Sequence, residues 1–243
     1  MWNKEAQHQK ETMRELFSRI AARYDLVDTL ISLGQDQRWR KEALTMTHVP
    51  PNGKLLDVAT GTGEVALAAR KLFPSLQITG VDLTQAMVAL ALKKAQHQSI
   101  TWGISDGLAL PFPDNTFDAA ISAFMMRNVP NVLQAFKEQA RVVKPGGRIV
   151  CLEITWPTRF PMSLLFKWYF FGWTPFLGRL ISGDTGAYTY LPRSVKNFIS
   201  PPIVAQQMKE AGLKAITWHL KMLGTIAIYT GVKDACQRQT DTL

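Results

Sequence analysis

The chain has 243 residues, of which 47% are hydrophobic, and a formal net charge of +9 at pH 7, which is enough apolar material for one domain with a substantial core. Its polar start and its lack of any run of roughly 20 apolar residues lead us to expect neither a secretory signal nor a transmembrane helix. The two cysteines, Cys151 and Cys236, are too few for a disulfide framework or a cysteine-rich zinc site, so we expect a cytoplasmic protein.

Residues 1–50 predict an N-terminal helical cap. Apolar side chains recur at helical spacing over 10–33 and again over 38–46. We expect these helices to pack onto the core that follows, or to cover its mouth.

Residues 51–154 alternate short apolar runs with helical patterns. Such alternation predicts βαβ units and a parallel sheet. Thr84 is a credible N-cap, and Pro-Gly-Gly at 145–147 predicts that a helix ends before the next strand. The expected strands are 55–59, 77–83, 100–105, 117–123 and 148–154, and the expected helices are 64–72, 84–95 and 131–143.

Residues 155–200 interrupt this alternation and form an aromatic-rich insertion. Nine aromatic residues lie between Trp156 and Phe176. Basic charge is also concentrated in the last third of the chain, which favours an apolar ligand or a lipid surface; an ordinary basic surface around an aromatic core is the alternative. Four prolines are expected to break any long helix here. They are Pro157, Pro161, Pro175 and Pro192.

Residues 201–233 complete the sheet, and residues 234–243 form a polar tail. A helix over 202–213 is followed by strands over 214–223 and 224–232, which predict an antiparallel hairpin. The predicted fold is α/β, a Rossmann-like, doubly wound, mostly parallel seven-stranded sheet with a C-terminal antiparallel hairpin, a helical cap and an insertion, in one structural domain.

A glycine-rich stretch follows the first expected strand. Gly61, Gly63 and Ala66 satisfy the dinucleotide pattern G-x-G-x-x-G/A, which is a weak signal by itself. Asp82 ends the second strand, where an acidic residue can grip a ribose hydroxyl pair. These residues alone leave a nicotinamide oxidoreductase open.

Two further carboxylates argue against a pyrophosphate. Asp57 lies four residues before the first glycine, and Asp106 follows the third strand. Together with Asp82 they would surround one cleft, repel a pyrophosphate and suit a cationic cofactor. S-adenosyl-L-methionine has a sulfonium, an ammonium and no phosphate, so it is the cofactor that we expect.

Residues 55–153 then resemble a class I S-adenosylmethionine-dependent methyltransferase, and ARVVKPGGRIVCLE resembles the passage of that class into its fifth strand. The resemblance implies a cofactor site at the strand ends, which Tyr24 from the cap would close. The expected cofactor-binding residues are Tyr24, Asp57, Gly61, Thr62, Gly63, Asp82, Leu83, Asp106, Gly107 and Ala123.

Nucleic acid is the obvious acceptor to consider for a basic methyltransferase. After the fourth strand the chain reads AFMMRNVPN, without the Asn/Asp-Pro-Pro-aromatic set that serves exocyclic base nitrogens. No cysteine is placed to attack a pyrimidine, and no separate basic RNA-binding module is present. We therefore expect no nucleic-acid partner.

Three stretches instead resemble the ubiquinone/menaquinone C-methyltransferase family, the UbiE/MenG type. They are FSRIAARYDLVDTLISLGQDQRWRK, MMRNVPN and GDTGAYTYLPRSVKNF, and the resemblance runs from about Phe17 to Val232. The chain departs from the family in GQDQRW, where many members have a histidine, in Glu64, where Asp is common, and in SAFMMRN, where many members have Ser-Phe-Gly-Leu-Arg-Asn.

The family resemblance implies carbon methylation of a prenylated quinol, in which loss of a phenolic proton activates the ring carbon. Arg127 would stabilise the phenolate and Asn128 would orient it. Tyr188 and Tyr190 would contact the quinol, and Asp184 would assist proton loss. A structural ion pair is the alternative for Arg127, and ordinary packing is the alternative for each tyrosine.

The expected function is methylation of a demethylated prenyl quinol such as demethylmenaquinol. A related enzyme that methylates a phospholipid amine or a specialised metabolite is the alternative, and a non-catalytic binding protein is a third. The insertion would line a tunnel for the isoprenoid tail or lie on the membrane, which implies transient contact with its inner face. The four histidines show no ligand spacing, so we expect no metal; a homodimer is left open.

Overall fold

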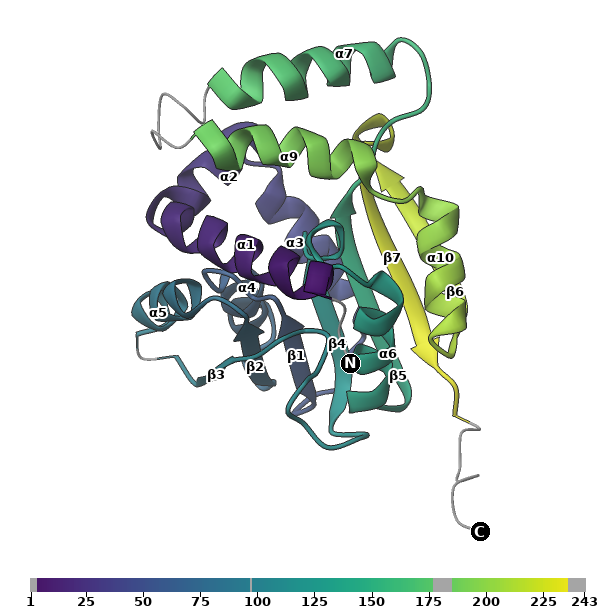
Figure 1. The fold of residues 1–243 in the computed structure, drawn as a ribbon. Coiled ribbons are helices and arrows are strands. Elements are labelled where there is room, and N and C mark those ends of the chain that lie inside the picture. Colours follow the sequence, from purple (N-terminus) through teal and green to yellow (C-terminus); the bar gives the residue numbers. More distant parts are fainter. Residues whose placement is uncertain (1–3, 97, 177–184, 236–243) are drawn as a thin grey trace.

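Figure 1 shows the computed structural model, which describes residues 4–96, 98–176 and 185–235, without the side chains of residues 6 and 185–189. Its centre is a seven-stranded sheet in the order β3-β2-β1-β4-β5-β7-β6. Strands β1 to β5 run parallel, and β7 is antiparallel to both β5 and β6. The predicted Rossmann-like fold and its C-terminal hairpin are confirmed. The strands are β1 Lys54–Val58, β2 Gln77–Asp82, β3 Ile100–Ile104, β4 Phe117–Ala123, β5 Val143–Ile154, β6 Leu213–Lys221 and β7 Ile226–Lys233.

The central strands are apolar on both faces because helices cover both. Successive residues of a strand point to opposite faces, so Leu55 packs with α3 and α4 whereas Leu56 packs with α6 and α10. This two-sided burial explains why the sequence shows near-continuous apolar runs rather than alternation. The helices are α3 Asp36–Thr45, α4 Glu64–Leu72, α5 Gln85–Lys94, α6 Val132–Val142 and α10 Pro201–Glu210.

The junction between α6 and β5 differs from the sequence prediction. Helix α6 ends at Val142 and β5 begins at the next residue, so Pro-Gly-Gly lies within the strand. The register of β4 on β5 shifts nearby, as at a bulge that takes up extra residues. A Cβ on Gly147 would lie 2.5 Å from the carbonyl oxygen of Asp118, so this close approach of two strands requires glycine.

The N-terminal residues form helices, as predicted, with a break in the middle. Helix α1 spans Lys4–Ile20 and α2 spans Tyr24–Ser32, with a 3-10 turn at Ala21–Arg23 between them. Leu16, Ile20 and Val27 form a small apolar cluster of their own. Figure 1 shows α1 (purple) lying across the ends of the strands, where it covers the carboxyl edge of the sheet.

The insertion is helical, and two of its prolines lie inside helices. Helix α7 (Met162–Trp168) continues through a π-helical turn at Tyr169–Trp173 and on to residue 176, and α9 spans Thr185–Asn197. The expectation that prolines would break any long helix here was wrong for Pro192, which lies within α9, and for Pro175, which follows the π-helical turn. A widened turn relieves the clash of a proline ring with the preceding turn. In the described ranges, no helix is long and apolar enough to cross a membrane.

Candidate active site

A cavity of about 120 Å³ lies where β1, β2, β3 and β4 end. The loops that follow these strands form its walls, and α1 covers it. The carboxyl edge of a parallel sheet, at the point where the strand order reverses, is where α/β proteins bind ligands. Seven of the predicted cofactor residues line this cavity. They are Tyr24, Gly61, Asp82, Leu83, Asp106, Gly107 and Ala123.

Two backbone N–H groups hold the Asp82 carboxylate in place. Gly61 N donates to Oδ2 at 2.9 Å and Thr84 N donates to Oδ1 at 2.8 Å. Thr84 is the N-cap of α5, as predicted. Burial raises the pKa of Asp82, while both bonds favour its ionised form. A carboxylate fixed at this strand end can accept hydrogen bonds from the hydroxyls of a ribose.

Helix α1 contributes contacts that the sequence did not predict. Lys10 Nζ forms an ion pair with Asp106, and Asp106 Oδ1 also accepts a hydrogen bond from Leu108 N at 2.9 Å. Met13 and Phe17 line the same cavity. The amphipathic pattern revealed the helix, but nothing local in the sequence indicated which strand ends it would cover.

Three predicted cofactor residues lie outside the lining of the cavity. Asp57 is 1% exposed and accepts a hydrogen bond from Thr60 Oγ1 at 2.5 Å, and burial raises its pKa to about 7. Thr62 Oγ1 donates to Asp25 Oδ1 at 2.5 Å. Gly63 lies against Trp102 of β3 and Ala91 of α5. Direct contact of these three residues with a cofactor stays a prediction.

We expect different defects when Gly61 and Gly63 of the loop are replaced by alanine. Both glycines have a positive φ, 58° for Gly61 and 87° for Gly63, so either alanine costs about 1–2 kcal/mol of backbone strain. A Cβ on Gly61 meets nothing within 4 Å, whereas one on Gly63 would lie 2.8 Å from Trp102 Cη2. We expect Gly63→Ala to lower the free energy of unfolding by about 1–3 kcal/mol more than Gly61→Ala does.

Gly61→Ala, in contrast, is expected to weaken binding of S-adenosylmethionine at least about tenfold, because its methyl group enters the space of the ligand. Chemical denaturation and calorimetric titration measure the two effects. Equal stability and equal affinity of the two variants would contradict this assignment of the loop.

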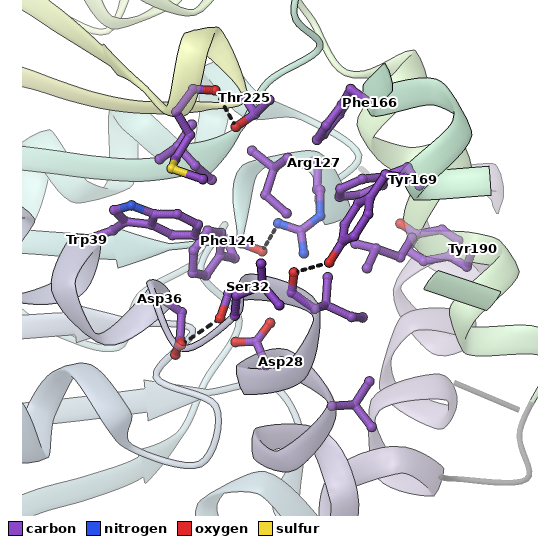
Figure 2. A pocket seen from close by; sticks show the side chains of 18 of the residues that line it. Asp28, Ser32, Asp36, Trp39, Phe124, Arg127, Phe166, Tyr169, Tyr190 and Thr225 are labelled. Carbon is purple, nitrogen blue, oxygen red and sulfur yellow. Dashed lines mark hydrogen bonds between the residues drawn. The ribbon is translucent and has the colours of Figure 1, made fainter. Parts of the chain in front are cut away.

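A second cavity of about 500 Å³ adjoins the first, between the N-terminal helices, the insertion and the last strands. Figure 2 shows the side chains around it, many of them aromatic, including Trp39, Phe124, Phe166 and Tyr169. The two cavities share four lining residues, so a polar ligand in the smaller one can meet an apolar ligand in the larger one. These residues are Phe17, Tyr24, Phe124 and Asn128.

Arg127 lines the larger cavity and belongs to a buried ion pair. Its Nη1 donates to Glu153 Oε1 at 2.5 Å and to the Phe124 carbonyl oxygen at 2.9 Å. Both side chains are almost fully buried, and Arg127 Nε has no partner among the described residues. The ion-pair alternative raised for Arg127 is therefore present in the structure, at the wall of the cavity.

Asn128 and Tyr190 meet at the same place. Tyr190 Oη donates to Asn128 Oδ1 at 3.1 Å, and Asn128 Nδ2 donates to the Phe124 carbonyl oxygen at 3.0 Å. Burial raises the pKa of the Tyr190 hydroxyl, so this group stays protonated at neutral pH. Tyr188 belongs to α9 but its side chain lies outside the described part of the chain, as does the whole of Asp184.

The structure also places two aspartates in the cavity wall that sequence reasoning did not assign. Asp28 and Asp36 both line the larger cavity, and both pair with Arg40. The i, i+4 spacing of Asp36 and Arg40 on α3 could have predicted their ion pair. Asp28 lies on α2, so no sequence spacing indicated its pair with Arg40. Over the described ranges, no group of three or more His, Cys, Asp or Glu side chains is arranged to hold a metal ion.

The strand order and the antiparallel last strand give the chain the fold of the class I methyltransferases, and Asp82 and Asp106 line a cavity at its strand ends. The model of the ubiE/COQ5 methyltransferase family matches residues 4–233. The chain belongs to that family.

Two curated relatives and one solved structure illustrate the similarity. The chain is 39% identical to a ubiquinone/menaquinone biosynthesis C-methyltransferase UbiE of Desulfotalea psychrophila, with 91% of this chain and 90% of the relative covered. It is 41% identical to a demethylmenaquinone methyltransferase of Thermus thermophilus, with 89% and 99% covered. In fold it is similar to Haemonchus contortus phosphoethanolamine N-methyltransferase 2 in complex with S-adenosylhomocysteine, with 15% identity, a TM-score of 0.62, and 80% and 52% covered.

Proposed function

We propose that this enzyme transfers a methyl group from S-adenosyl-L-methionine to a ring carbon of a demethylated prenyl quinol of the demethylmenaquinol type. The observation that carries the proposal is the contact between two cavities, a small one with Asp82 and Asp106 in its wall and a larger one lined mainly by apolar side chains. The relatives named above, at about 40% identity over most of both chains, support the same acceptor.

The residues of the smaller cavity fit this cofactor. Asp82 and Asp106 supply acceptors for hydroxyl and amino groups at the strand ends, and the open space over Gly61 lets a ligand approach the backbone closely. The bound cofactor would supply an electrophilic methyl group. Among the predicted residues we assign Tyr24, Asp82, Leu83, Asp106, Gly107 and Ala123 to its binding.

The residues around the junction of the cavities would orient the acceptor. Tyr190 and Asn128 form a hydrogen-bonded pair that can hold a quinol hydroxyl, and the Arg127 guanidinium can stabilise negative charge on its oxygen. The apolar walls exclude water and align the ring with the methyl group, from which most of the rate acceleration would come. Tyr188 and Asp184 keep the roles that the family resemblance implies.

Methyl transfer from labelled S-adenosylmethionine to a short-tailed demethylmenaquinol, kept reduced, tests the proposal. We expect label in the extracted quinone. Label in a phospholipid amine instead would favour the alternative acceptor, and cofactor binding without any transfer would indicate a binding protein.

We further propose that the enzyme works in the cytoplasm at the inner face of the membrane. Large apolar side chains are exposed around the entrance to the larger cavity, among them Leu33 (75%), Trp168 (73%) and Leu223 (75%). Phe160 (81%), just before α7, and Leu164 (59%), on α7, are also exposed and do not line the cavity. Such a surface suits insertion into lipid headgroups, from which a substrate tail could enter. A homodimer stays a prediction.

Replacing Phe160 and Leu164 together by serine is expected to weaken binding to anionic phospholipid vesicles at least about tenfold, since each side chain contributes about 1.5–3 kcal/mol when fully buried. Turnover of a short-tailed acceptor without vesicles should stay unchanged, because neither residue lines the cavity. Trp218→Ser, at another exposed aromatic residue on β6, is the matched control. Vesicle co-sedimentation measures the effect, and equal loss in the control would contradict a specific surface.

A further inference from the structure

Asp28 places an ionisable carboxyl group in the wall of the larger cavity. It follows Tyr24 by one helical turn of α2, so both side chains lie on the same side of the helix. Figure 2 shows Asp28 from α2 and Arg127 from the segment after β4 among the side chains around the cavity. Tyr24 lines both cavities. Asp28 is therefore near the junction at which the two ligands would meet.

The hydrogen bonds of Asp28 leave one of its oxygens available. Arg40 Nη2 donates to Oδ2 at 2.7 Å, and among the described residues no other group donates to this carboxylate. Its side chain is 27% exposed. Asp36, in contrast, is 3% exposed and has both oxygens engaged, because Ser32 Oγ donates to Oδ1 at 2.8 Å and Arg40 Nη1 bonds to Oδ2.

The charges around Asp28 leave one negative charge uncompensated. Two carboxylates, Asp28 and Asp36, share the single guanidinium of Arg40, and on the other wall Arg127 is already paired with Glu153. The remaining titratable groups that face the cavity are the hydroxyls of Tyr24, Tyr169 and Tyr190. Burial raises the pKa of all three, so none of them competes as a base at neutral pH.

Burial also raises the pKa of Asp28, although Arg40 opposes the effect. A carboxylate with a raised pKa is a better proton acceptor than an exposed one. Asp28 is thus the one described carboxylate that faces the cavity with a free oxygen, a surplus charge and a raised basicity.

We propose that Asp28 is the general base that removes the phenolic proton of the acceptor, an inference that rests on the proposed function. The O–H bond breaks, its proton moves to Asp28 Oδ1, and its electron pair enters the ring. The ring carbon then uses an electron pair to form a bond to the methyl group, whose bond to sulfur breaks with both electrons left on a neutral thioether. The ring carbon loses its own proton to water, and the C–H electron pair restores the aromatic ring as a phenolate. Asp28 returns its proton to that oxygen, which gives the methylated quinol and regenerates the base.

The test compares Asp28→Asn with Asp36→Asn. Each variant leaves Arg40 one carboxylate, but only the first removes the base. We expect Asp28→Asn to lower kcat about 100-fold or more with KM nearly unchanged, and Asp36→Asn to lower it less than about tenfold. Circular dichroism and thermal unfolding check that both variants fold, and Asp28→Glu should recover part of the rate.

Acceptors with electron-withdrawing ring substituents have a more acidic phenol. The rate measured with them depends on Asp28 differently if this residue is a base than if it is only structural. The deficit of Asp28→Asn should shrink as the phenol pKa falls, and its kcat should rise with pH where that of the wild type has levelled off. Quenching of tryptophan fluorescence by the quinone form reports acceptor binding independently of turnover.

Two failures can be told apart. A wild-type enzyme that binds the cofactor but labels no quinol overturns the proposed function. An active wild type with an equally active Asp28→Asn, or a deficit that ignores phenol acidity, overturns the role of Asp28 and leaves the proposed function in place.

Discussion

Arg127→Met is expected to lower the free energy of unfolding by about 3–5 kcal/mol and to reduce methyl transfer by about 100-fold or more. The stability falls because Glu153, which is fully buried, loses its cationic partner and keeps only backbone donors, Ile154 N at 2.8 Å and the N–H of residue 127 at 3.3 Å. Turnover is expected to fall because, under the proposed function, the cation that stabilises the acceptor oxygen is gone. Urea denaturation and single-turnover kinetics measure the two losses.

A double variant separates the two consequences. Arg127→Met combined with Glu153→Gln removes the unpaired charge, and the one oxygen of the glutamine amide can still accept the hydrogen bond from Ile154 N. We expect at least half of the lost stability to return, because removing both members of a buried pair costs less than removing one. Methyl transfer should stay low. A double variant that regains full activity would reduce Arg127 to a structural role.

The strands and the cofactor edge of the sheet could be predicted because their signals are local. An apolar run followed by Gly61 reports a strand and its turn within a few residues, and the carboxylates at the ends of β1, β2 and β3 could be read in the same way. The predicted roles of Arg127 and Asn128 came from the family resemblance alone, since their spacing does not indicate which residues face them.

The missed contacts all join segments that are distant in the sequence. Lys10 of α1 pairs with Asp106, which follows β3. Glu153 of β5 pairs with Arg127, which follows β4. Hydrophobic periodicity identifies which face of a helix is buried but not which element packs against it. The set of residues that lines the larger cavity could therefore not be derived from the sequence. Pro192 was misread for a related reason, because helix-breaking is a local preference that tertiary packing of α9 overrides.

The remaining large effect concerns Asp57, whose pKa burial raises to about 7, with the hydrogen bond from Thr60 as the main opposing contribution. Because the folded-state pKa lies above the unfolded value of 3.8, the stability from this group is fully present below about pH 4 and is lost as pH rises through about 7. This pKa shift corresponds to a change of at most about 4 kcal/mol in the free energy of unfolding.

We therefore expect Asp57→Asn to gain stability relative to the wild type as pH rises from 4 to 8, by up to about 4 kcal/mol. Asp57 Oδ1 has no partner among the described residues, so an amide there carries a penalty of its own, but that penalty does not change with pH. The slope of the difference, measured by urea denaturation at several pH values, is the readout. Thr60→Val removes the bond that favours the carboxylate and should move the wild-type loss of stability to higher pH. A difference that is flat between pH 4 and 8 would mean that Asp57 is ionised throughout, which would require a cation or solvent at its free oxygen.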